Sequence, residues 1–281
     1  MPETVPPRLV PESGQASAEV NVVAGQSTVT SARATSPLKL LTPRARGQSV
    51  WLYASSYGGG MVAGDRTSFR LELGRDARCF AGTQASTKIY RNAGLRPCSH
   101  SMKGTLAPGS LLVYAPDPVQ CFRESSYTQR QEFRMEPGSG LVLVDACCSG
   151  RAARGERWAF SRYQSRNELF VGDERLLVDS LLLDPADGPL DGRHRLGRFN
   201  CLALVLVIGA PLREFAKRLL EEIEAMPVPR QAPLLLSASP ARDGVILRVA
   251  GERVEEVGRA IRERLSFVRD LLGDDPWARK W

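Results

Sequence analysis

Three aspartates stand where a carboxylate is unusual, beside or inside apolar runs of strand character. Asp65 closes a glycine-rich run, Asp145 ends an apolar run, and Asp179 interrupts a leucine-rich one. A carboxylate in such a place is costly unless it is paired, hydrated or turned outward. Two interpretations therefore stay open. Each aspartate is solvent-facing or paired with an arginine, or it lines a wet internal path or a site for a hard cation.

The six cysteines and two histidines form no recognised metal or catalytic motif, because CxxC and HExxH are both missing. His100 and His194 lie in polar, turn-like stretches, which predicts that both are at the surface. Cys147 and Cys148 are adjacent and would point to opposite faces of a strand. We expect free, mostly buried thiols. A cysteine-dependent hydrolase using Cys147 or Cys148 is an alternative, but it would need a partner histidine, and the only downstream one is His194.

The segment GGGMVAGD carries Gly58, Gly59, Gly60 and Gly64 but is not a phosphate loop, because no Lys-Ser/Thr pair follows its last glycine. GxGxxG and GxSxG are also missing. We expect these glycines to serve backbone conformation, since glycine accepts positive φ and close approach. The sequence thus gives no sign of an NTPase.

Composition further narrows the class of protein to which this chain can belong. The chain has 281 residues, 43% of them hydrophobic and 25% charged, as in ordinary globular proteins. Its longest apolar stretch, 201–210, is too short to cross a bilayer. The first 14 residues contain no apolar core of a secretory signal, so we expect a cytoplasmic protein without a membrane partner.

The net charge of +7 is spread along the chain, with no block of like charges. A basic nucleic-acid-binding β protein is therefore an alternative, and it would need an exposed basic face studded with aromatic residues. Aromatic residues are only 7% of the chain. Several of them, Trp51, Tyr53, Trp158 and Tyr163, lie in core-like patterns, so we expect no nucleic-acid partner.

Short β-type runs separated by turn residues predict a layered, barrel or solenoid-like β body. Residues 211–226 and 252–272 carry apolar side chains at helical spacing and predict two amphipathic helices near the C-terminus. Residues 1–18 are rich in Pro, Ser and Glu and predict a disordered extension. We expect 19–281 to form a single domain. The predicted strands are 20–23, 50–54, 68–73, 87–91, 111–115, 131–135, 141–145, 168–171, 176–183, 201–208, 234–238 and 245–250.

Five segments in register resemble the UreD (UreH) family of urease accessory proteins. The clearest are the GGGMVAGD turn and the strand-like ASTKIYR, about twenty residues later. YAPDPV at 114–119 resembles the family's LPDP-type segment. SGR…RGERW at 149–158 and SRNE at 165–168 resemble its GR…GE…F and S-R-x-E segments. The resemblance runs from about Ala18 to the end of the chain.

The resemblance implies a non-enzymatic scaffold in urease maturation. Its expected fold is mainly β, a β-helix-like stack of short strands with two amphipathic α-helices in the C-terminal part. Family members bind the helical accessory protein UreF, recruit the GTPase UreG through it, and dock on the urease apoprotein. Nickel is thought to reach urease through a water-filled tunnel in UreD. The resemblance therefore implies nickel in transit and no tightly bound cofactor.

Four positions match residues associated with that tunnel: Asp65, Thr87, Asp145 and Asp179. The resemblance implies that they line the nickel path and bind the ion weakly. Ni²⁺ moves with water and oxygen ligands when no imidazole or thiolate traps it, and a chain with only two histidines suits transfer. The other motif residues are expected to be structural: Gly58, Gly59, Gly60, Gly64, Lys88, Tyr90, Arg91 and Glu156.

Overall fold

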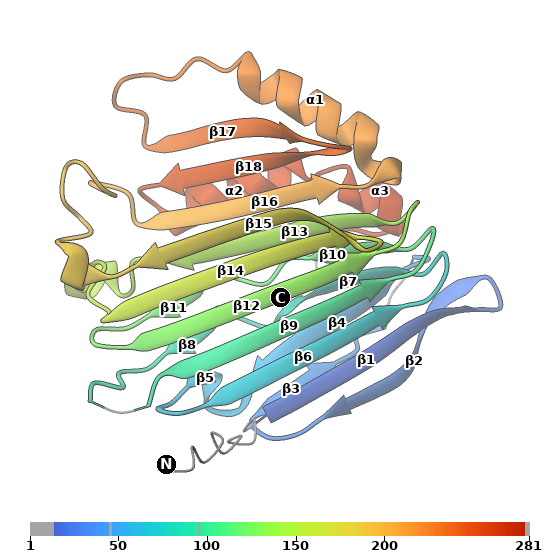
Figure 1. The fold of residues 1–281 in the computed structure, drawn as a ribbon, viewed down its shortest axis with the longest axis horizontal. Coiled ribbons are helices and arrows are strands. Elements are labelled where there is room, and N and C mark those ends of the chain that lie inside the picture. The colour runs from blue at the N-terminus through green and yellow to red at the C-terminus, as the bar shows by residue number, and fades with distance from the viewer. Residues whose placement is uncertain (1–13, 45–46, 95, 279–281) are drawn as a thin grey trace, which may run out of the picture.

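The computed structural model describes residues 14–44, 47–94 and 96–278. Successive strands wind from one sheet to a second and back, so that parallel strands stack along a β-solenoid of about four turns (Figure 1). This confirms the expected stack of short strands. A third, narrow side of the solenoid is made of very short strands that join the second sheet.

The first sheet has seven strands in the order β15-β14-β12-β9-β6-β1-β2. Its five central strands, from β14 to β1, run parallel, and the two edge strands are antiparallel to their neighbours. The bounds are β1 Gly14–Val23, β2 Gln26–Ala34, β6 Arg66–Leu73, β9 Cys98–Leu106, β12 Ser126–Met135, β14 Arg162–Val171 and β15 Glu174–Leu183.

The second sheet has eleven strands, with the main order β17-β18-β16-β13-β10-β7-β4-β3 and the short strands β5, β8 and β11 attached. Its bounds are β3 Leu38–Leu41, β4 Val50–Ser56, β5 Gly60–Met61, β7 Arg78–Thr83, β8 Lys88–Ile89, β10 Leu111–Tyr114, β11 Val119–Cys121, β13 Gly140–Cys148, β16 Cys201–Ile208, β17 Leu234–Ala241 and β18 Gly244–Gly251. The helices are α1 Arg213–Glu224, α2 Val254–Arg264 and α3 Val268–Leu272.

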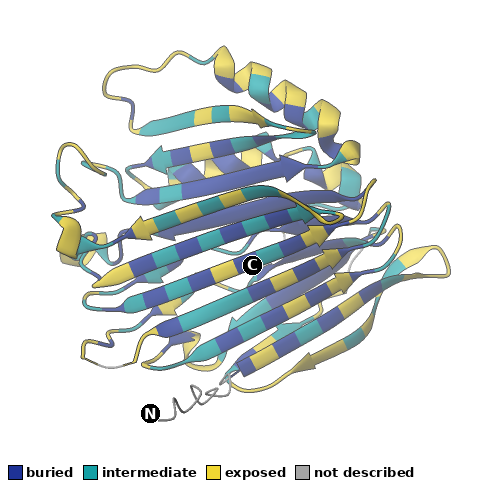
Figure 2. Ribbon diagram, viewed as in Figure 1, coloured by how far each residue is buried: buried dark blue, intermediate teal, exposed yellow. Residues whose placement is uncertain are grey.

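Apolar and polar residues alternate along the strands of the first sheet, so one face of this sheet packs on the core and the other faces solvent. In β6, Phe69, Leu71 and Leu73 are buried, while Arg70 and Glu72 face solvent. The same alternation appears as bands of colour along the sheet that faces the viewer in Figure 2. Strand β13 is instead buried over almost its whole length, because the first sheet covers one of its faces and the helices pack behind the other.

The helices pack on the face of the second sheet that lies away from the first sheet. Leu219 of α1, Ile261 of α2 and Leu272 of α3 share one apolar cluster with strands β13, β16 and β18. The helix predicted over 211–226 is confirmed as α1, preceded by a short 3₁₀ turn. The single helix predicted over 252–272 is wrong, because the chain breaks after Arg264 and the break lets Phe267 stack on Phe215 of α1.

Several strand predictions need correction. Residues 14–18 are not disordered: they begin β1, where Ala16 and Ala18 are buried against the parallel neighbour β6. The remainder of the predicted extension, 1–13, lies outside the described residues. The strand expected over 87–91 is shorter in the structure, where β8 spans only Lys88–Ile89 and pairs with the equally short strands β5 and β11. Strands β2, β7 and β9 have polar or short sequences that gave no strand pattern.

Among the described residues, no helix combines the length and the apolar character that crossing a bilayer requires.

Candidate functional site

A row of polar side chains crosses the first sheet on its inner face. Cross-strand pairing places Thr67 of β6 beside His100 of β9, His100 beside Gln129 of β12, and Gln129 beside Ser165 of β14. Neighbouring strands lie about 4.8 Å apart, so the row spans roughly 14 Å. Thr67, Gln129 and Ser165 are buried, and His100 is half-buried. The interior between the sheets is therefore polar along this line, although apolar clusters lie on both sides of it.

Asp145 of β13 faces this row from the opposite sheet. Its Oδ1 accepts a hydrogen bond from Gln129 Nε2 at 2.9 Å. Its Oδ2 accepts two more, from Ser165 Oγ at 2.6 Å and Asn167 Nδ2 at 2.8 Å. Asn167 is held in turn by Gln131, whose Nε2 donates to Asn167 Oδ1 at 2.8 Å. All these side chains are buried, so the carboxylate is fixed by a connected network.

Burial raises the pKa of the Asp145 carboxyl above its ordinary value, because the charged form loses hydration. The three hydrogen bonds oppose this rise, since donors to the carboxylate stabilise its ionised form. Asp179 adds a smaller upward effect through charge repulsion. A proton and a cation would therefore compete for the same two oxygens of this carboxyl group.

Two cavities contain Asp145 in their linings. The first, of about 320 Å³, lies on the side of the early turns and includes Thr87, His100 and Asp117. The described residues that line it include two carboxylates, Asp117 and Asp145, and no lysine or arginine. In a chain with a net charge of +7, this is a locally cation-attracting space.

The second cavity, of about 710 Å³, lies on the side of the late strands β15 to β18. It includes Asp179, whose carboxylate pairs with Arg248 at 3.1 Å, and Cys147. The register places Asp179 beside Asn167, which donates to Asp145. Of the predicted residues, Thr87 therefore lines the first cavity, Asp179 lines the second, and Asp145 lines both.

Asp65 lies apart from these three. Its Oδ2 accepts a hydrogen bond from the Val62 N–H at 2.8 Å and so closes the turn that follows the glycine run. Neither cavity has Asp65 in its lining. Its part in a nickel path therefore stays a prediction from the family resemblance.

The prediction of a surface histidine is wrong for His100 and right for His194. His194 is exposed in a loop, whereas His100 lies on the inner face of β9 and lines the first cavity. Burial lowers the pKa of the His100 imidazole to about 4, because the charged ring would lose hydration. Thr67 Oγ1 lies 2.8 Å from His100 Nδ1 in a hydrogen bond.

The glycine run and the strand after it are joined as structural parts. Gly58 and Gly59 have φ of +81° and +67°, in the left-handed region that favours glycine. Gly60 is extended, and a Cβ there would lie 2.5 Å from the Lys88 carbonyl oxygen and 2.8 Å from the Tyr90 ring. Tyr90 Oη also donates to the Gly58 carbonyl at 3.0 Å. The side chain of Lys88 itself is exposed.

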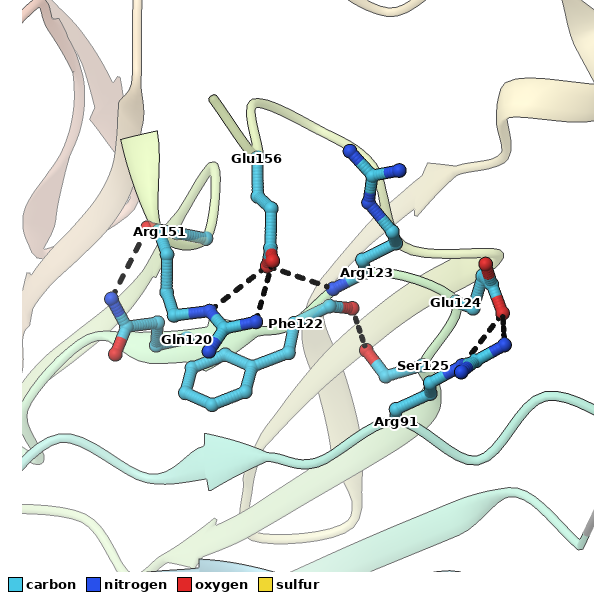
Figure 3. Close-up of polar contacts among 9 residues, drawn as sticks. Arg91, Gln120, Phe122, Arg123, Glu124, Ser125, Arg151 and Glu156 are labelled. Carbon is cyan, nitrogen blue, oxygen red and sulfur yellow. Dashed lines mark hydrogen bonds and ion pairs between the residues drawn. The ribbon is translucent and has the colours of Figure 1, made fainter. Parts of the chain in front are cut away.

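Glu156 holds the loop after β13 against the narrow side of the solenoid (Figure 3). Its carboxylate pairs with Arg151 and accepts a bond from the Arg123 N–H at 3.4 Å. The Arg151 guanidinium lies 4.3 Å from the centre of the Phe122 ring, and its hydrogen bond lowers the pKa of Glu156. Arg91 pairs with Glu124 at 2.6 Å on the exposed side of the same region. The close contacts of both motif residues fit the structural role expected of them.

The cysteines are free in the described structure, and five of the six are buried. Cys147 lines the second cavity while Cys148 packs beside the helical core, on opposite faces as expected. Burial raises the pKa of Cys147 well above its ordinary value, which is the reverse of what a nucleophile needs. Exposed His194 has no hydrogen bond to either thiol among the described contacts.

Sequence reasoning missed the partners that make Asp145 a site. Their side chains lie on separate turns and come together only through the strand register. The one available signal was the alternation of β12 and β14, which places their polar residues on the buried face. These missed residues are Thr67, His100, Asp117, Gln129, Gln131, Ser165 and Asn167.

Comparison with known proteins gives a consistent result. The sequence profile described as "UreD urease accessory protein" matches residues 12–281. The chain belongs to the UreD family of urease accessory proteins. Among similar proteins, "Urease accessory protein UreD" of Sorangium cellulosum (strain So ce56) is 44% identical over 260 residues, which cover 92% of this chain and 81% of that protein.

Two further UreD relatives extend the comparison. "Urease accessory protein UreD" of Anaeromyxobacter sp. (strain Fw109-5) is 40% identical over 97% of this chain and 91% of its own length. "Urease accessory protein D" of Arabidopsis thaliana is 32% identical over 92% of this chain and 98% of its own length. The resemblance drawn from the motifs is therefore confirmed, and these relatives carry accessory-protein names rather than enzyme names.

Proposed function

We propose that this chain is a non-enzymatic scaffold that bridges a UreF-type protein, and through it a UreG-type GTPase, to the urease apoprotein, and that nickel crosses it between the two sheets on its way to urease. The observation that supports the path is the position of Asp145 in the linings of both cavities. The partners are carried over from the family, and the scaffold would act in the cytoplasm.

The chemistry of the path suits a divalent ion in transit. Oxygen-bearing side chains recur from Thr87 through Asp117 and Asp145 to Asp179. Among the described residues, no three His, Cys, Asp or Glu side chains come together as a metal site would require. Each stop therefore offers few protein ligands, and water completes the coordination of the ion, so that release stays fast.

The low polarity on either side of the polar row would confine the proposed path to that row. Apolar clusters enclose the row, so a hydrated cation has few favourable positions away from it. Asp145 is the deepest carboxylate, fixed by three donors that leave a lone pair on Oδ1 for a ligand. We therefore assign Asp145 as the central stop and Thr87 and Asp179 as stops on either side of it.

The experiment has two separable readouts. The tagged chain is mixed with the UreF-type protein, the GTPase and apo-urease from the same cell, with and without nickel and GTP. Co-purification tests the scaffold, and nickel per urease active site tests delivery. Complex formation with nickel-dependent loading is the expected result. Failure to bind either the UreF-type protein or apo-urease would refute the scaffold, and a complex that loads no nickel would refute the path.

A further inference from the structure

His100 occupies a position on the proposed path that none of the family motifs marks. It lines the first cavity and pairs in register with Gln129, whose amide donates to Asp145 Oδ1. The imidazole is thus about one strand spacing, roughly 5 Å, from the residue that contacts the central carboxylate. The chain has only one other histidine, His194, and that one is exposed.

Thr67 occupies one of the two ring nitrogens of His100. Its hydroxyl is the only hydrogen-bond partner of the imidazole among the described residues, and it contacts Nδ1. When Nδ1–H donates to a neighbour, Nε2 carries the free lone pair, and histidines that bind metals commonly use this arrangement. Because Thr67 is buried on the adjacent strand, its hydroxyl occupies Nδ1 and leaves Nε2 without a hydrogen-bond partner among the described residues. The tautomer that can bind a metal is the one in which Nδ1–H donates to Thr67 Oγ1.

We propose that His100 is a transient nickel ligand on this path, binding the ion through Nε2 beside Asp145 and favouring nickel over magnesium. The proposal rests on the proposed function, since it needs nickel to enter the first cavity.

Imidazole supplies the selectivity that the other side chains lack. Carboxylate, carbonyl and hydroxyl oxygens also suit Mg²⁺, whereas imidazole nitrogen suits nickel. The ring is neutral near pH 7, because burial lowers its pKa to about 4, and its lone pair therefore needs no deprotonation there. A single imidazole without a second histidine or thiolate beside it binds weakly enough to release the ion, so it selects without trapping.

The charges around His100 favour a cation. Asp117 and Asp145 line the same cavity, and no lysine or arginine does so among the described residues. A divalent ion at Nε2 would therefore meet carboxylates on its way in and on its way out.

The two histidines make the test direct. Imidazole NMR signals of the full-length chain, bound to its UreF-type partner, are assigned with His100→Gln and the matched control His194→Gln. Ni²⁺ alone is then titrated, and Mg²⁺ is titrated separately. We expect Ni²⁺ to broaden the His100 signals first and Mg²⁺ at the same concentration to leave them unchanged. His100 signals that stay sharp while nickel broadens His194, or that respond equally to both ions, would overturn the proposal.

A second variant covers the case in which His100→Gln does not fold. Thr67→Val keeps the branched shape and removes the hydroxyl that orients the ring, and we expect the nickel concentration needed for broadening to rise about tenfold. An unchanged titration would overturn the role given to Thr67 and Nε2.

An assay of nickel loading into urease distinguishes the role of His100 from the existence of the path through Asp145. With excess Mg²⁺ present, we expect His100→Gln to lower nickel per urease site several-fold and His194→Gln to leave it unchanged. If Asp145→Asn leaves loading intact, the path fails, whereas nickel binding at His100 is still decided by the NMR titration. If Asp145→Asn abolishes loading and His100→Gln does not change it, the path stands and the selectivity role is refuted.

Discussion

Replacing Asp145 by asparagine separates the charge of the central carboxylate from its structural role. Asparagine has nearly the same volume and keeps one oxygen that can accept hydrogen bonds. Gln129, Ser165 and Asn167 all donate to Asp145, so one donor must turn its amide or find water when the second oxygen becomes an NH₂ group. At about 1 kcal/mol for one net hydrogen bond, the variant loses little stability at neutral pH. Asp145→Leu, which leaves three donors without an acceptor, should cost about 3 kcal/mol.

The effect on nickel should be much larger than the effect on folding. Two unit charges 4 Å apart interact by about 1 kcal/mol in water, so a divalent ion beside the carboxylate gains about 2 kcal/mol even under strong screening. That corresponds to roughly a 30-fold change in occupancy at this stop. We therefore expect Asp145→Asn to form the partner complex normally and to slow nickel loading of urease by at least tenfold.

The assay measures nickel bound per urease active site over time, with equal amounts of assembled complex. Asp173→Asn is the matched control, because Asp173 is exposed in the turn between β14 and β15 and lines neither cavity. Loading by the control should equal that of the unmodified chain. If Asp145→Asn loads urease as fast as the control does, the path through Asp145 is refuted.

The same variant has a pH signature that does not depend on urease. The pKa of Asp145 is raised on folding, so between its ordinary value of 3.8 and its folded value the native state binds more protons than the unfolded state. The free energy of unfolding therefore falls as pH rises through this window, by about 1.4 kcal/mol for each unit of pKa difference. Asparagine does not titrate, so the stability of the variant relative to the unmodified chain should rise as the pH increases above 3.8 in urea unfolding. A constant difference would contradict the raised pKa.

Three further predictions test the surrounding structure. Gly60→Ala should destabilise the chain by about 1–3 kcal/mol, because the added Cβ meets the Lys88 carbonyl. Gly59→Ala has open space around its Cβ and should cost about 1 kcal/mol through its positive φ. Urea unfolding that ranks the two variants the other way would contradict this packing. Cys147 should resist iodoacetamide at pH 7.5 in the folded chain and react in urea, because burial raises its pKa; rapid labelling with loss of function would revive a thiol mechanism. The unmodified chain should lose stability as the pH falls from 6.5 to about 4, because the pKa of His100 is lowered in the folded state and the unfolded state binds the extra proton in that window. His100→Gln should remove this loss, and an unchanged pH profile would refute the lowered pKa.

The sequence was sufficient for the parts of the fold that depend on local patterns. Apolar runs and turn residues predicted β10, β16 and β18 nearly to their bounds, and helical spacing predicted α1. It was insufficient where tertiary contacts decide. Strand β9 reads CSHSMKGTL, with only Met102 and Leu106 as large apolar residues, and is a strand because parallel neighbours β6 and β12 satisfy its backbone. The break between α2 and α3 places Phe267 on Phe215, a contact between segments about fifty residues apart that local spacing does not reveal.

The polar row explains why the site could be anticipated only in part. Its members are 33, 29 and 36 residues apart along the chain, from Thr67 to His100, Gln129 and Ser165, so the turns of the solenoid differ in length and no repeat is visible. A lone aspartate in an apolar strand indicates a buried carboxylate that needs partners. Which side chains donate hydrogen bonds to it depends on the strand register across turns, which the sequence does not show. The same fact would make the proposed path tolerant of substitution. Because each proposed stop is supplied by a different turn, one side chain could change without altering the others, whereas a one-residue slip of a single strand would turn its polar residue outward and break the row.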